Sequence, residues 1–193
     1  MTRAFIHRRV AAVAAVLGLA VLAVAHGQAT WSTQVVIPDM LTIRVPTTVL
    51  AFAPGQGLPD GESLSGLSAP ASCPLSSTYP PLAFPACYPI ALRGGVLPLE
   101  VFSNLRGGWS LLLDVSDLTD ATGMYRLPAD RIWFQIGNGA WQRVSATTNP
   151  LYFGTGPTDG YLSLDIHFML ELDGNEHAGS FITNAVVSGM RQP

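Results

Sequence analysis

The stretch that reads GYLSLDIHFMLEL, residues 160–172, decides the fold class. Its apolar residues occupy every second position, and most positions between them are polar. Successive side chains of a β-strand point to opposite faces, so this alternation predicts one long strand with a buried face and a solvated face. The predicted buried face holds Leu162, Leu164, Ile166, Phe168, Leu170 and Leu172.

Shorter stretches of the same kind predict the other strands of a sandwich. A Gly137-Asn138-Gly139 turn favours a hairpin between residues 131–136 and 141–145, because these residue types tolerate positive φ. Short strands separated by Gly, Pro and Asn turns are typical of two packed antiparallel sheets. The expected fold is therefore all-β, an antiparallel immunoglobulin-like β-sandwich. Its other strands are expected at 31–37, 41–45, 48–53, 96–102, 109–115 and 180–188.

Residues 54–96 form a stretch rich in Pro, Gly and Ser. Eight of the 15 Pro lie between positions 54 and 89, and Pro removes donors from a strand ladder. The stretch is predicted to be a long surface loop. It contains Cys73 and Cys87, the two Cys of the chain. In an exported chain they are expected to form a disulfide around a ring of about 15 residues, worth about 3 kcal/mol; reactive or metal-binding thiols are the alternative.

The N-terminus has the pattern of a signal peptide over residues 1–29. MTRAFIHRRV is a basic segment, and AAVAAVLGLAVLAVA is an apolar segment of the expected size. Small residues allow cleavage after Ala25 or Ala29. An uncleaved anchor would need about 20 apolar residues, more than the apolar stretch offers. The expected mature chain is a single domain at residues 30–193. It would be secreted, at the cell surface or in the envelope, with the periplasm possible, and would have no membrane span.

The charge pattern excludes several functions. The chain has 10 basic and 13 acidic residues, a net charge of −3. Loss of Arg3, Arg8 and Arg9 with the signal peptide would make it −6. An acidic chain has no electrostatic footprint for nucleic acid. Every basic residue is Arg, so a Lys-Asn isopeptide bond cannot form, and any attachment to a surface is expected to be non-covalent.

No catalytic or metal-binding motif stands out. The polar face of residues 160–172 carries Asp165, His167 and Glu171, which are expected to be a solvated surface. The sequence has no Gly-x-Ser-x-Gly elbow, and one further His in the mature chain, His177, is too few for a His-rich zinc site. We expect a non-enzymatic protein without metal or cofactor. A secreted hydrolase with paired carboxylates remains an alternative.

The aromatic residues offer candidate binding positions. Trp109 begins an inward-facing series in residues 109–115, which places it in the core. Trp133 alternates with Ile132, Phe134 and Ile136 and is expected to point outward. An outward Trp can stack on a sugar ring or bury itself in a partner.

Three motifs resemble bacterial surface domains. LTIRVPTTVLAF (residues 41–52) resembles the opening strands of WxL domains, and GGWSLLLDVSDL (residues 107–118) resembles their Trp-x-Leu motif, here Trp109-Ser110-Leu111. HAGSFITNAVVSGM (residues 177–190) is similar to the closing strand of fimbrial and spore-coat-U-type sandwiches; it holds no second Trp-x-Leu, which WxL domains carry near the C-terminus. The resemblance implies a surface module, and for WxL domains peptidoglycan binding through Trp109 and Leu111.

Two classes of function follow. The first is a structural or adhesive protein of the cell envelope, whose partners are envelope components or copies of itself. It could polymerise by strand donation, in which an N-terminal strand with Trp31, Thr33, Val35 and Ile37 on one face completes a neighbour's sheet. The rival is a carbohydrate- or cell-wall-binding module, with Trp133 and the Pro-rich loop forming the site.

Overall fold

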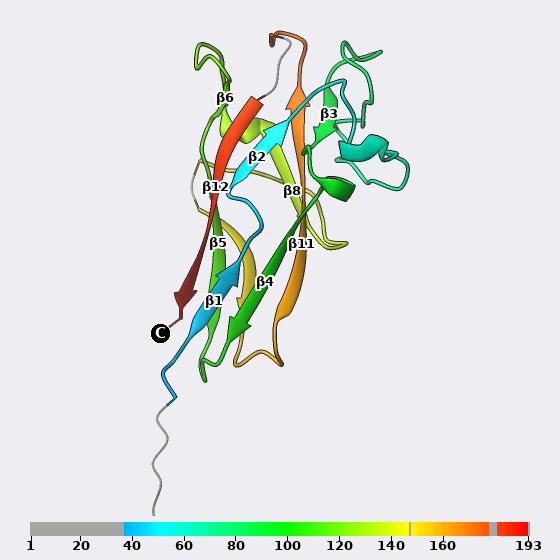
Figure 1. Ribbon diagram of the computed structural model, residues 1–193. Helices are drawn as coiled ribbons and strands as arrows, with labels where there is room; N and C mark the ends of the chain where they lie inside the picture. Colours follow the sequence, from blue (N-terminus) through cyan, green and yellow to red (C-terminus); the bar gives the residue numbers. More distant parts are fainter. Residues whose placement is uncertain (1–36, 147, 178–180, 193) are drawn as a thin grey trace, which may run out of the picture. The chain divides into compact units, whose positions relative to one another are not determined.

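The computed structural model describes residues 37–146, 148–177 and 181–192. Within this part of the chain, the residues from Asp39 onward form one compact unit. Two sheets pack against each other (Figure 1), and every ladder between their strands is antiparallel. The predicted all-β sandwich of antiparallel sheets is therefore confirmed. The predicted signal peptide and nearly all of the predicted strand 31–37 lie outside the described residues; Ile37 is 73% exposed and belongs to no strand.

The long strand predicted from the alternating pattern is β11, Leu162–Leu172, and it lies at the centre of the first sheet. Leu162, Leu164 and Ile166 face Val101, Leu99 and Leu97 of β4, so the apolar side chains of both strands share one face. The sheet has the order β1-β4-β11-β8-β9, and β3 pairs with the second half of β11. The bounds are β1 Leu41–Arg44, β3 Ala86–Pro89, β4 Val96–Ser103, β8 Ile132–Ile136 and β9 Gln142–Arg143.

The second sheet is built around β12, Phe181–Arg191. β5 and β6 pair with successive parts of β12 along one side, and β2 pairs with its first half on the other side. β10 extends the sheet beyond β5, and β7 extends it beyond β6. The bounds are β2 Val49–Phe52, β5 Trp109–Val115, β6 Leu118–Asp120, β7 Arg126–Leu127 and β10 Asn149–Gly154.

The core lies between the two sheets. Most of the alternate residues that the sequence predicted to point inward are buried there, and Trp109, Phe134 and Phe168 are among the largest of them. Leu162 and Leu164 are partly buried and pack against this core. Three short 3-10 turns, Pro59–Gly61, Arg93–Gly95 and Ala129–Arg131, complete the regular structure of the described residues. No helix within the described residues is long and apolar enough to cross a lipid bilayer.

The predicted loop at residues 54–96 is more regular than its composition indicates. Residues 86–89 form β3, which pairs with β11 although it ends at Pro89. Cys87 N–H points away from β11, to the carbonyl of Pro74. Pro89 follows two residues later, so its missing N–H also lies on the side away from β11, where the ladder with β11 needs no donor. The predicted disulfide between Cys73 and Cys87 is present. β10 and the β6–β7 hairpin were also missed, since both lie in turn-rich sequence.

The outer face of β11 corrects a second expectation. It was predicted to be solvated along its whole length, and Asp165 is indeed exposed. Farther along the strand, Met169 and Glu171 are buried. The covering residues include Leu67, Leu75 and the disulfide, which all come from the Pro-rich segment. This segment therefore forms a third layer over one end of the first sheet.

Candidate functional site

The predicted site residue Trp133 lies in a cluster on the outer face of the first sheet. Trp133 in β8 pairs directly with Arg143 in β9 on one side and with Met169 in β11 on the other. Directly paired residues of an antiparallel ladder point to the same face. Glu171 follows two residues after Met169 and so shares that face. The ladder registers thus bring together an indole, a guanidinium and a carboxylate.

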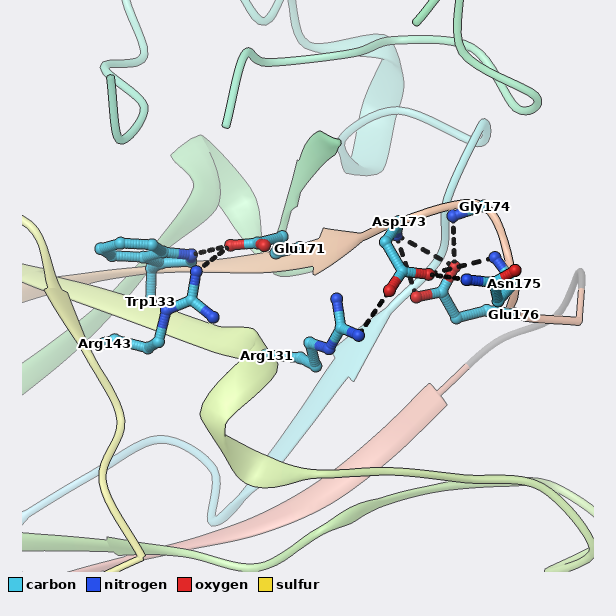
Figure 2. A network of polar contacts seen from close by, with 8 residues as sticks. All are labelled: Arg131, Trp133, Arg143, Glu171, Asp173, Gly174, Asn175 and Glu176. Atoms are coloured by element: carbon cyan, nitrogen blue, oxygen red, sulfur yellow. Dashed lines mark hydrogen bonds and ion pairs between the residues drawn. The ribbon is translucent and has the colours of Figure 1, made fainter. Parts of the chain in front are cut away.

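The three polar side chains of this cluster bind one another. The Trp133 indole N–H donates to Glu171 Oε2 at 2.6 Å, and Arg143 Nη2 donates to the same oxygen at 2.7 Å. The Arg143 guanidinium carbon also lies 4.5 Å from the centroid of the Trp133 ring. Figure 2 shows both side chains converging on Glu171. The carboxylate is almost buried, and a charge at such depth is tolerated because it is paired and hydrogen-bonded.

Trp133 lies on the outer face of β8, opposite to the buried Ile132 and Phe134, but this face is partly covered. The ring is half-buried and packs against a small second core of Cys73, Cys87 and Met169 under the Pro-rich segment. Period-two alternation correctly placed Trp133 on the outer face. The alternation could not show that the Pro-rich segment folds back over this face, because that contact is between residues remote in sequence.

A second polar network joins the 3-10 turn before β8 to the β11–β12 connection. Arg131 Nη2 binds Asp173 Oδ2 at 2.5 Å, and the Asp173 carboxylate also accepts from Asn175. The Glu176 carboxylate accepts from the backbone N–H groups of Asp173 and Gly174. Figure 2 shows these side chains meeting at the end of β11. The hydrogen bond from Arg131 holds the pKa of Asp173 at about 2, below its ordinary 3.8.

This network predicts a loss of stability in acid. A carboxyl whose pKa is lower in the folded chain stabilises the fold fully above its unfolded pKa, and this contribution falls as the pH drops toward about 2. Chemical denaturation of the wild type should show the free energy of unfolding declining between about pH 4 and pH 2. Asp173→Asn and Arg131→Gln should each flatten this part of the profile. Profiles of wild type and Asp173→Asn that run parallel over this interval would contradict the assignment.

Trp109 and Leu111, the residues of the Trp-x-Leu motif, both lie in the core between the sheets. The Trp109 indole N–H donates to the Gly156 carbonyl at 2.7 Å, and its ring lies 5.4 Å from that of Tyr152. Trp109 is also among the residues that line a pocket of about 380 Å³. Tyr152, Asp159, Tyr161 and Ser163 contribute to the rim of this pocket, which mixes aromatic rings with polar groups.

The remaining predicted polar residues, Asp165 and His167, both lie in β11. Burial lowers the pKa of His167, against the opposing effect of Asp165, and so favours the neutral imidazole. The described residues hold no group of three His, Cys, Asp or Glu side chains arranged for a metal ion. Asp173 and Glu176 line one pocket, but the bonds described above already occupy both carboxylates.

A feature that the sequence did not reveal is a seam between β1 and the second half of β12 (Figure 1). Ala185 N–H donates to the carbonyl of Thr48. The alternate residues that follow point their backbone groups away from β5, and no strand among the described residues forms a ladder with them. In β1, the backbone groups of Leu41 and Ile43 likewise point away from β4. Within the described residues, none of these backbone groups is hydrogen-bonded. The unpaired edge of β12 consists of Val187, Gly189 and Arg191.

Side chains hold the seam together in place of a ladder. Gly189 has no side chain, and Leu41 fills that space: a Cβ at position 189 would lie 2.5 Å from Leu41 Cδ2. Arg191 and Asp39 form an ion pair at 2.8 Å across the end of the seam. β1 is four residues long and only partly buried, so a competing strand could move it at modest cost.

The chain was compared with protein-family models, with curated proteins and with solved structures, and none of them matches it.

Proposed function

We propose that the chain is an exported, non-enzymatic structural or adhesive protein of the cell envelope that assembles by strand donation. Residues 1–29 serve as its signal peptide, and residues 30–193 form the mature protein with an immunoglobulin-like sandwich. In the assembly, the N-terminal strand of one copy, with Trp31, Thr33, Val35 and Ile37 on one face, pairs with the seam of another copy.

The unpaired edge of β12 is the observation that carries this proposal. An exposed strand edge offers a row of N–H and C=O groups to any extended segment, and proteins usually cover such edges. Three alternate residues of this edge have no backbone partner among the described residues, which suits a donated strand of about seven residues. The segment before Pro38 has this length and a strand-like alternation. The Cys73–Cys87 disulfide agrees with an oxidising compartment.

Strand donation is tested with the exported chain and a variant that lacks residues 30–38. The full chain should form a ladder of oligomers in sedimentation velocity, because each copy both donates and accepts. The shortened variant should lose these oligomers and bind a synthetic peptide of residues 30–38, but not a scrambled peptide of the same composition. Absence of oligomers larger than a dimer from the full chain, together with no peptide binding, would refute the proposal.

The second candidate is a carbohydrate- or cell-wall-binding module. The pocket beside Trp109 favours it, since aromatic and polar groups converge there and its volume lies in the range of small-molecule sites. Binding to a glycan panel that is lost in Tyr161→Ala and kept in Trp133→Ala would place the ligand at this pocket. The opposite result would place it at the Trp133 cluster. No binding by the wild type would exclude both sites.

A further inference from the structure

The outer face of the second sheet carries an uncovered row of apolar side chains along β12. Phe181, Thr183 and Ala185 point into the core, so the residues between them point outward. Three of the outward residues are large and apolar: Ile182 is 40% exposed, Val186 55% and Met190 53%. The positions between these three are Asn184 and Ser188, which are polar and uncharged.

The neighbouring strands widen this apolar surface. Phe153 in β10 and Met190 in β12 both pair with Ser110 in β5, so the three share the outer face. Phe153 is 61% exposed, and Ser110 is buried between its two larger neighbours. Val49 in β2, opposite Asn184, adds a further exposed apolar side chain. Among the outward residues of β5 and β12, the single charged one is Asp114, opposite Val186.

Within the described residues, the outer face of the first sheet has no such apolar row. It carries the exposed polar residues Glu100, Ser163 and Asp165 at one end, and the Pro-rich segment covers the other end. Polar exposure and a covering layer are the two usual ways in which a sheet face is made compatible with water. The face over β12 carries large exposed apolar side chains between its few polar ones, and no described segment covers it. Extended apolar patches of this kind mark interaction sites.

The outward pattern of β12 is self-complementary. Ile182, Val186 and Met190 are spaced by four residues, with Asn184 and Ser188 midway between them, so the order apolar-polar-apolar-polar-apolar reads the same in both directions. A two-fold axis that lies between two facing copies, perpendicular to β12 at Val186, would set Ile182 of one copy over Met190 of the other. It would also pair Asn184 with Ser188 and Val186 with its own counterpart. Such an isologous contact requires one patch that matches itself.

Charge and area also favour a second copy as the occupant. The proposed mature chain has a net charge of −6, so the repulsion between two copies is weakest where they meet through a surface that carries few charges. β12 has 11 residues; with three to four strands at 4.8 Å spacing, the face covers roughly 600 Å². This approaches the roughly 800 Å² per partner that stable interfaces bury.

We propose that the outer face of β12 is a self-association surface, through which two copies of this chain pack sheet on sheet. The contact is separate from strand donation: it uses side chains of a sheet face rather than a strand edge, and it closes at two copies. It leaves the seam between β1 and β12 free. In this arrangement the two Asp114 carboxylates lie near each other, which weakens the dimer.

The test measures dimer dissociation by sedimentation equilibrium in the exported chain lacking residues 30–38, which cannot donate a strand. Circular dichroism first checks that this variant is folded, and the full chain with Val35→Pro serves in its place if it is not. Val186→Glu and, separately, Met190→Glu should raise the dissociation constant at least tenfold, because each buries an unpaired charge. Ser163→Glu, the matched control, adds the same charge to the exposed face of the other sheet and should leave the constant unchanged. Asp114→Asn should tighten the dimer.

Three results would overturn the proposal. The first is a protein that remains monomeric up to millimolar concentration. The second is a dimer that Val186→Glu and Met190→Glu leave intact while both variants stay folded. The third is a dimer that Ser163→Glu weakens as strongly as Val186→Glu, because the loss would then reflect added charge rather than this face.

Discussion

Trp109→Ala is expected to lower the free energy of unfolding by about 3–5 kcal/mol, the usual cost of truncating a fully buried Trp. Trp109 is among the largest fully buried side chains, and it also donates its indole N–H to Gly156. A domain of this size is stabilised by about 5–15 kcal/mol, so the variant should be close to unfolding. Urea denaturation followed by circular dichroism measures the difference.

The neighbouring glycines supply the control for Trp109. A Cβ at Gly154 would lie 2.1 Å from Trp109 Cε2, whereas a Cβ at Gly156 would meet no atom within 4 Å. Gly154→Ala should therefore cost up to about 3 kcal/mol through overpacking, and Gly156→Ala should change little. Adding Gly154→Ala to Trp109→Ala should cost almost nothing further, because the ring is gone. Equal effects of the two glycine variants would contradict the proposed packing of Trp109.

Removal of the disulfide is the second large effect. Cys73→Ser combined with Cys87→Ser should cost about 3 kcal/mol, as expected for opening a loop of about 15 residues. Both positions are buried in the second core beneath the Pro-rich segment, where a hydroxyl is poorly accommodated. The measurement compares urea midpoints of the wild type and the double variant under oxidising conditions.

The part of the chain that loses structure when the disulfide is removed provides a control. β3 and the Pro-rich segment depend on Cys87, whose backbone bonds to Pro74 and Ser76, whereas the main core between the sheets holds neither Cys. Limited proteolysis of the double variant should therefore cut within residues 54–86 before it cuts the sandwich. Reduction of the wild type should reproduce the effect. An unchanged urea midpoint, both in the double variant and in the reduced wild type, would show that the disulfide contributes nothing to stability.

The sequence predicts the parts of this fold that depend on local pattern. The alternation in residues 160–172 identifies β11 with its buried face, and the Gly137-Asn138-Gly139 turn identifies the β8–β9 hairpin. β3 could not be predicted, because its four partner residues lie 80 to 86 positions away in β11 and its own sequence ends in Pro. Pairing over such a distance leaves no mark in the local pattern.

The candidate surfaces were predicted less well, for the same reason. Trp133 was assigned to the correct side of β8, but the segment that covers it is remote in sequence. The seam was missed because the residues of β12 do not reveal whether a neighbouring strand forms a ladder with them. That depends on the position of β1, which is remote in sequence. The symmetric spacing of Ile182, Val186 and Met190 is visible in the sequence. Only the structure shows that these side chains are exposed, and this exposure identifies them as a candidate interaction surface.

Hydrogen exchange at the backbone amides of Val187, Gly189 and Arg191 tests the central claim of assembly through the seam. These amides should exchange rapidly in the chain lacking residues 30–38, because no other described residue accepts a hydrogen bond from them. In the full-length oligomer they should become protected, while the amides of Ser188 and Met190, which face β5, should be protected in both samples. Equal exchange rates of the first three amides in the two samples would contradict strand donation into the seam.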